Sequence, residues 1–207
     1  DWTEESSDAA GSSADGIGVM AGPYLSARIT PNLFFDTRFA GGISENSVGP
    51  FGLYEDDFST ERWLASARLT GNWRLGNFRI TPSVGATYVE EDQDSYVDSL
   101  GVLIPGQTVS LGRMAFGPEI AYRFMLADGA TIEPHFAITG MWDFDNPGTL
   151  SVGGLTAGGD DLHALVRAGI LAQSARGASF RVVGTYDGIG SDFDAFGGQV
   201  WLNIPLR

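Results

Sequence analysis

The chain has 207 residues, a formal net charge of -14 at pH 7, 29 glycines and no cysteine. This charge excludes nucleic-acid binding as the main function, because neutralising phosphates requires clustered basic side chains. The lack of cysteine excludes disulfides, thiolate metal sites and thiolate nucleophiles. The chain has no apolar run as long as a transmembrane helix. It begins with neither a methionine nor a signal peptide, so we expect a processed or excised piece of a longer protein.

Alternation of apolar and polar residues predicts about nine strands along the chain. Their ranges are 16–29, 33–45, 61–74, 78–91, 108–125, 131–143, 162–173, 178–188 and 195–206. Tight turns at ITPNL, RLGNF, MLADGAT and QSARGAS alternate with longer loops that are acidic or rich in glycine. Residues 1–15, which are acidic, are expected to form an extracellular loop or a disordered N-terminal segment. Residues 16–207 are expected to form one barrel domain that is incomplete at its N-terminal side.

Each predicted strand has one apolar face and one polar face. In the strand 78–91, Phe78 and Ile80 share a face, whereas Arg79 and Thr81 lie on the other. All twelve basic residues are arginines, and most of them lie within the alternating segments, opposite the apolar row. The polar face predicted in this way carries Arg28, Arg38, Arg68, Arg79, Arg113, Arg123, Arg167, Arg181, Glu119 and Glu133, together with Asp36, Asp143, Asp187, His135 and His163.

The apolar face could be the core of a soluble sandwich or the outer surface of a membrane barrel. The polar face favours the barrel, because its arginines and small residues suit a closed lumen better than a solvated surface. Trp63 and Trp73 are ten residues apart on one face, as are Phe78 and Tyr88. That spacing is about 33 Å along a strand and projects to about 25 Å in a strand tilted by about 40°, which matches the height of the apolar band. An aromatic girdle is predicted at Trp63, Trp73, Phe78, Tyr88 and Trp142.

The predicted fold is an all-β, antiparallel, up-and-down transmembrane β-barrel in contact with outer-membrane lipid. If the short turns face the periplasm, the long loops are extracellular and the chain ends in the periplasm. The first visible strand then starts outside the cell. Nine strands with ends on opposite sides are not a complete barrel, so an odd number of strands is expected before Asp1.

Several stretches resemble the β-domain of autotransporters, the translocator of type V secretion. They are GPYLSARITPNLFFDTRFAGG, FSTERWLASARLTGNWRLGNFRITPSVGATYVEE, YVDSLGVLIPGQTVSLGRMAFGPEIAYRF, ADGATIEPHFAITGMWDFDN and the closing YDGIGSDFDAFGGQVWLNIPLR. The resemblance implies a Gram-negative outer-membrane barrel of twelve strands, three of them before Asp1. It also implies export or tethering of an N-terminal passenger, a plug helix in the lumen, and insertion by the barrel assembly machinery. The chain departs from the family in ending at Leu206 and Arg207 rather than at an aromatic residue.

Other functions stay open at this stage. A small porin-like or structural barrel without a passenger would show the same alternation. An outer-membrane lipid hydrolase would need a serine and a carboxylate beside His135 or His163, but both histidines are predicted on the lumen face, away from lipid. We therefore predict no enzyme, no cofactor and no metal. The charged lining either receives a plug helix or passenger, or pairs with itself and fills the lumen.

Overall fold

The computed structural model describes residues 2–7, 12–49, 53–145, 150–152, 155–157 and 162–205. Its principal strands are β1 (Trp2–Ser7), β2 (Ser12–Ala21), β4 (Leu33–Gly49), β5 (Asp56–Gly71), β7 (Phe78–Gln93), β10 (Gln107–Tyr122), β12 (Thr131–Asp145), β15 (Leu162–Gln173), β16 (Ser179–Ile189) and β17 (Ala195–Asn203). Shorter strands are β3 (Tyr24–Thr30), β6 (Trp73–Leu75), β8 (Tyr96–Val97), β9 (Leu103–Ile104), β11 (Phe124–Met125), β13 (Leu150–Val152) and β14 (Leu155–Ala157). None of the described residues forms a helix, so no helical membrane span is found among them.

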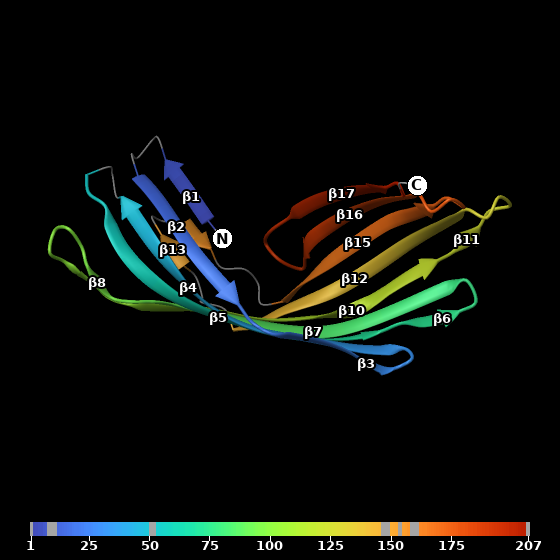
Figure 1. Cartoon of the computed structure of the whole chain (residues 1–207), viewed down its shortest axis with the longest axis horizontal. Helices are drawn as coiled ribbons and strands as arrows, with labels where there is room; N and C mark the ends of the chain where they lie inside the picture. The colour runs from blue at the N-terminus through green and yellow to red at the C-terminus, as the bar shows by residue number, and fades with distance from the viewer. Residues whose placement is uncertain are drawn as a thin grey trace. The chain divides into compact units, whose positions relative to one another are not determined.

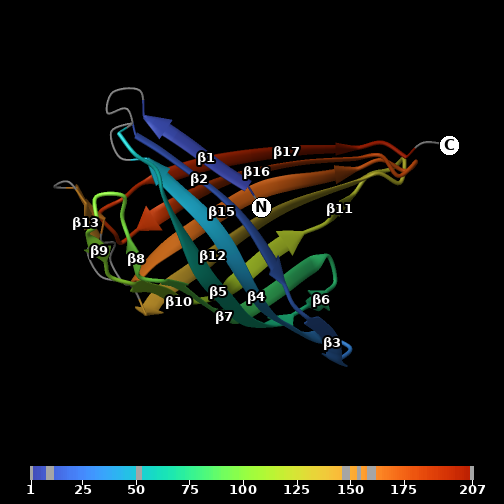
Figure 2. The same ribbon diagram turned by 60° about the vertical axis from the view of Figure 1, so that its left-hand side comes forward.

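The principal strands follow chain order in the sheet, β1-β2-β4-β5-β7-β10-β12-β15-β16-β17, as expected for an up-and-down topology. Seen from two directions, β12, β15, β16 and β17 run side by side (Figures 1 and 2). Each of the nine predicted strands is present, and β1 is a tenth principal strand that the sequence did not predict. Three of the nine are interrupted by single or paired residues, at 22–23, at Asn72 and at Arg123, and continue as β3, β6 and β11.

The chain divides into two compact units, which are described separately. The first comprises Asp1–Leu25, Thr37–Ser66 and Thr87–Gly112, and the second comprises Ser26–Asp36, Ala67–Ala86 and Arg113–Arg207. In the first unit β1 pairs antiparallel with β2, from Trp2 opposite Ile17 to Ser7 opposite Ser12. This hairpin differs from the loop or disordered segment predicted for residues 1–15, whose acidic composition masks its strand character. The extracellular position of the segment stays a prediction.

A long loop of the first unit carries the small hairpin β8–β9, in which Tyr96 pairs with Ile104. Two contacts hold it on β5. The rings of Phe58 and Tyr96 stack with centroids 5.4 Å apart, and the carboxylate of Asp56 accepts hydrogen bonds from the backbone N–H of Ser99 (2.8 Å) and its hydroxyl (2.6 Å). Burial, and after it the nearby carboxylate of Asp56, raises the pKa of the Tyr96 phenol. Side-chain contacts with β5 therefore brace the loop.

In the second unit β12, β15, β16 and β17 pair antiparallel in continuous register. One row crosses the four strands at Glu133, Leu171, Arg181 and Trp201. The short turns of this unit contain Gly76, Gly129 and Gly177 at φ values of 63°, 81° and 89°, where glycine is the residue with no steric cost. These positions confirm the turns predicted at RLGNF, MLADGAT and QSARGAS. The predicted strand end at Leu206 lies outside the described residues, and β17 ends at Asn203.

Gly169 in β15 makes room for a ring of the opposite strand. A Cβ at this position would lie 2.7 Å from Cε1 and Nε2 of His135 and 2.5 Å from the carbonyl oxygen of Val182. We therefore expect Gly169→Ala to destabilise the barrel by about 1–3 kcal/mol, since an overpacked site must shift backbone or ring. The measurement is the midpoint of urea unfolding, followed by heat-modifiable gel migration. Gly184→Ala is the matched control, because its Cβ would come no closer than 4.0 Å to Ala168. Equal midpoints for both variants would contradict this packing.

Candidate functional site in the polar face of the second unit

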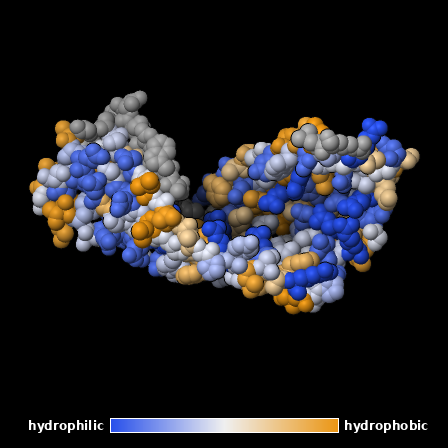
Figure 3. Space-filling view, in the orientation of Figure 1, coloured by the Kyte–Doolittle hydropathy of each residue, from blue (hydrophilic) through white to orange (hydrophobic). Residues whose placement is uncertain are grey.

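Strand β12 shows an inverted burial pattern. Its apolar residues Ile132, Phe136 and Ile138 are exposed, whereas Glu133 and His135 are buried. A soluble sheet would show the opposite pattern, since apolar side chains leave water first. Among the described residues, the buried hydrophobic ones are only Ala40, Ala121, Ala137 and Val183, and no large side chain is fully buried. Hydrophilic residues gather in the hollow of the second unit, with hydrophobic residues along its margins (Figure 3).

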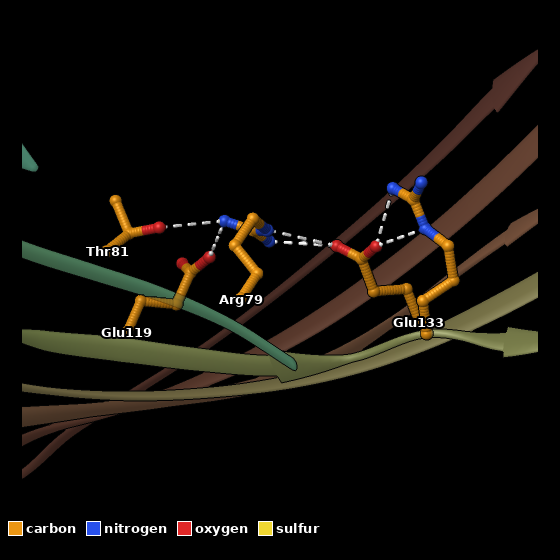
Figure 4. Close-up of polar contacts among 5 residues, drawn as sticks. Arg79, Thr81, Glu119 and Glu133 are labelled. Atoms are coloured by element: carbon orange, nitrogen blue, oxygen red, sulfur yellow. Dashed lines mark hydrogen bonds and ion pairs between the residues drawn. The ribbon is translucent and has the colours of Figure 1, made fainter. Parts of the chain in front are cut away.

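Glu133 is the centre of a charged cluster that joins three strands (Figure 4). Its side chain is 8% exposed, and each carboxylate oxygen has its own guanidinium: Oε1 lies 2.9 Å from Nη2 of Arg79, and Oε2 lies 2.8 Å from Nη2 of Arg123. Arg79 also reaches Oε1 of Glu119 at 3.0 Å and donates to the hydroxyl of Thr81 at 3.1 Å. The two arginines and the two glutamates of this cluster thus neutralise one another. Charged groups that are kept out of water need such partners.

A second charged cluster lies farther along the same face. Arg113 of β10 donates from Nε to Oδ1 of Asp143 at 2.6 Å and from Nη2 to Oδ2 at 2.8 Å, a two-pronged arrangement that fixes both side chains. His163 of β15 is 4% exposed and lies 3.5 Å from Oδ1 of Asp187, and its ring meets Phe193 edge-on at 5.2 Å between centroids. Neither ring nitrogen makes a hydrogen bond to the described residues.

Comparison with known proteins decides what kind of domain this is. The family model described as "Autotransporter beta-domain" matches residues 2–200. The chain belongs to this family. It is therefore an outer-membrane translocator barrel for a passenger. The crystal structure of the β domain of the Bordetella autotransporter BrkA has a similar fold, with a TM-score of 0.65 and 14% sequence identity. The match covers 96% of this chain and 76% of that one. No curated protein matches the chain.

On the polar face of this autotransporter β-domain, only part of the predicted lining forms ion pairs, and these pairs lie in two separate clusters. Arg79, Arg113, Arg123, Glu119 and Glu133 make ion pairs, the second of them with Asp143. The other predicted arginines make no ion pair with the described residues: Arg28, Arg38, Arg68, Arg167 and Arg181. Arg28 donates to the carbonyls of Thr30 and Pro31 and so closes its own turn. Arg181 lies over the ring of Trp201, 5.3 Å from its centroid.

Two groups of aromatic side chains lie on the apolar face, one in each unit. In the first unit, Trp63 Nε1 and the Tyr88 hydroxyl donate to the two carboxylate oxygens of Glu90, at 3.0 and 2.9 Å. In the second unit, the ring of Phe78 meets that of Tyr122 at 4.6 Å between centroids. Aromatic rings with polar ends are typical of the membrane interface. Trp73 and Trp142 are also exposed, but the girdle role of all these residues stays a prediction.

Two features of the β-domain could not be found in the sequence. The acceptor role of Glu90 was missed, because alternation places this carboxylate on the apolar face and gives no partner for it. Trp201 was not placed on the polar face, although its register partner Arg181 is there. Only the pairing of β16 with β17 shows that Trp201 lies beside Arg181. The described residues contain no group of three or more histidine, aspartate or glutamate side chains arranged to hold a metal ion.

Proposed function

We propose that this β-domain holds its passenger or a plug helix against the polar face of the barrel, and that it performs no catalysis itself. The proposal rests on the inverted burial of β12, with Glu133 and His135 inside and Phe136 outside. A face lined by paired charges and small side chains offers hydrogen bonds to a polar segment, whereas the opposite face suits lipid. Insertion would depend on the barrel assembly machinery.

A lipid hydrolase is disfavoured by the placement of the two histidines. His135 and His163 are both buried on the polar face, whereas a lipid acyl chain would meet the apolar one. His135 lies against Gly169, and His163 lies against Phe193 and Asp187. A triad needs a serine hydroxyl within hydrogen-bond reach of the imidazole. No hydrogen bond joins a serine to either histidine among the described residues.

We further propose that the long loops are extracellular and the short turns periplasmic. Because the chain lacks cysteine, single cysteines can be introduced without background labelling. We expect a membrane-impermeant maleimide to label Leu100→Cys in the β8–β9 loop on intact cells and to leave Ala175→Cys in the β15–β16 turn unlabelled. Outer-membrane permeabilisation should then expose Ala175→Cys. The reverse pattern would invert the proposed orientation.

Passenger export is tested separately, with an epitope fused ahead of residue 1. On intact cells we expect antibody or protease to reach the epitope while the barrel remains heat-modifiable. A porin-like barrel without a passenger function would leave the epitope in the periplasm, and that result would overturn the proposal. The control for cell lysis is the same epitope fused to an inactive β-lactamase fragment, which is similar in size to this chain but forms no barrel. Its epitope should stay inaccessible on intact cells.

A further inference from the structure

Two arginines on the polar face of the second unit make no hydrogen bond, ion pair or ring contact with the described residues. Arg68 of β5 lies against Gly85, since a Cβ at Gly85 would come within 3.3 Å of the Arg68 Cβ and 3.4 Å of its Nε. Arg167 of β15 pairs in register with Ala137 and Thr185. Neither guanidinium makes a hydrogen bond or an ion pair with any residue that the structure describes. Both side chains therefore have their donors available.

The described carboxylates on the same face of the second unit already have partners, including Asp36, which accepts a hydrogen bond from the hydroxyl of Ser26. Glu119 and Glu133 are held by Arg79 and Arg123, and Asp143 is held at both oxygens by Arg113. The residues opposite Arg167, Ala137 and Thr185, carry no charge. Asp187 lies one row away from Thr185 on β16 and has His163 as its neighbour at 3.5 Å.

This face therefore has a surplus of positive charge in a chain whose net charge is -14. The acidic residues that give this net charge lie largely in stretches such as YEDDFSTE and EEDQDSYVD, outside the second unit. Arg181 adds a further cation, which stacks on Trp201 and makes no ion pair. A guanidinium presents several donors in a rigid fork that matches a carboxylate, and such charge-assisted pairs are the stronger kind of hydrogen bond.

We propose that Arg68 and Arg167 bind carboxylates of an acidic polypeptide segment that lies against the polar face of the second unit. This rests on the proposed function, in which a plug helix or passenger occupies that face, and it specifies the chemistry of the occupant. The ion pairs around Glu133 and Asp143 hold neighbouring strands together. Arg68 and Arg167 instead favour an acidic segment over a basic one.

The test uses the full chain, refolded in detergent micelles, and two fluorescent peptides of equal length, one rich in glutamate and one rich in lysine. A protein with a net charge of -14 repels an acidic peptide everywhere except at a locally cationic face. We therefore expect the glutamate peptide to bind, with an affinity that falls as salt is raised. The double variant Arg68→Ser/Arg167→Ser should weaken that binding at least tenfold and leave lysine-peptide binding unchanged.

Two further variants make the result specific. Arg176→Ser removes an exposed arginine of the β15–β16 turn and should leave glutamate-peptide binding unchanged. Arg68→Lys/Arg167→Lys keeps both charges and should retain much of the affinity. Heat-modifiable migration shows that each variant is folded. The inference is overturned if the glutamate peptide does not bind the folded protein, or if it binds the double serine variant as well as the wild type. Both failures leave surface display of the fused epitope unaffected, so the proposed function is tested independently.

Discussion

Glu133→Gln is expected to destabilise the barrel by about 2–4 kcal/mol, because breaking a buried ion pair leaves an uncompensated charge behind. The side chain of Glu133 is 8% exposed, and its two oxygens neutralise Arg79 and Arg123 at 2.9 and 2.8 Å. An amide of the same shape carries no charge and accepts at only one atom, so Arg123 loses the carboxylate that it pairs with, whereas Arg79 keeps Glu119. The fraction folded across a urea series, read from heat-modifiable migration in lipid vesicles, measures the loss.

Two controls separate this effect from a general sensitivity to charge. Glu119→Gln should cost less, because Arg79 keeps its contact with Glu133. Glu91→Gln breaks the more exposed pair with Arg62, whose side chain is 44% exposed, and should change the free energy of unfolding by less than about 1 kcal/mol. If all three variants were equally stable, Glu133 would not be the centre of a network that holds β7, β10 and β12 together.

Ile138→Arg is expected to cost about 2–4 kcal/mol, since arginine on the lipid face of a barrel strand is penalised most near the bilayer midplane. Ile138 lies at the middle of β12 and is 44% exposed. In a soluble protein the same change at an exposed site would alter stability by no more than about 0.5 kcal/mol. The variant thus distinguishes the membrane from water as the medium around this face.

The comparison for Ile138→Arg is Leu100→Arg. Leu100 is 69% exposed and lies in the braced loop of the first unit, beyond the strands. We expect this variant to fold in vesicles with wild-type yield and urea midpoint. A wild-type midpoint for Ile138→Arg as well would show that the apolar row of β12 does not contact lipid.

The sequence predicted the faces of the strands but not the contacts between them. Alternation of period two is a local property, so it placed Glu133, His135 and Arg79 on one face without any knowledge of neighbouring strands. Which guanidinium meets which carboxylate depends on register across β7, β10 and β12, which alternation does not encode. For the same reason Arg167 and Arg79 looked alike in the sequence, although one is unpaired and the other makes two ion pairs.

The N-terminal hairpin shows a different limit. Residues 2–7 read WTEESS, which is too acidic to suggest a strand, yet β1 pairs along β2 over its whole length. Backbone pairing with an existing strand edge supplies hydrogen bonds whatever the side chains are, so tertiary context overrides the weak local preference.

The inverted faces also bear on how the polypeptide reaches its destination. Apolar residues occupy every second position in the strands, so the chain has a mean hydropathy of only -0.01. A secretion channel releases sideways into the inner membrane those segments that present about 20 consecutive apolar residues, and alternating strands never do. The pattern that builds a lipid-facing surface after folding therefore lets the unfolded chain pass through the inner membrane without being retained there.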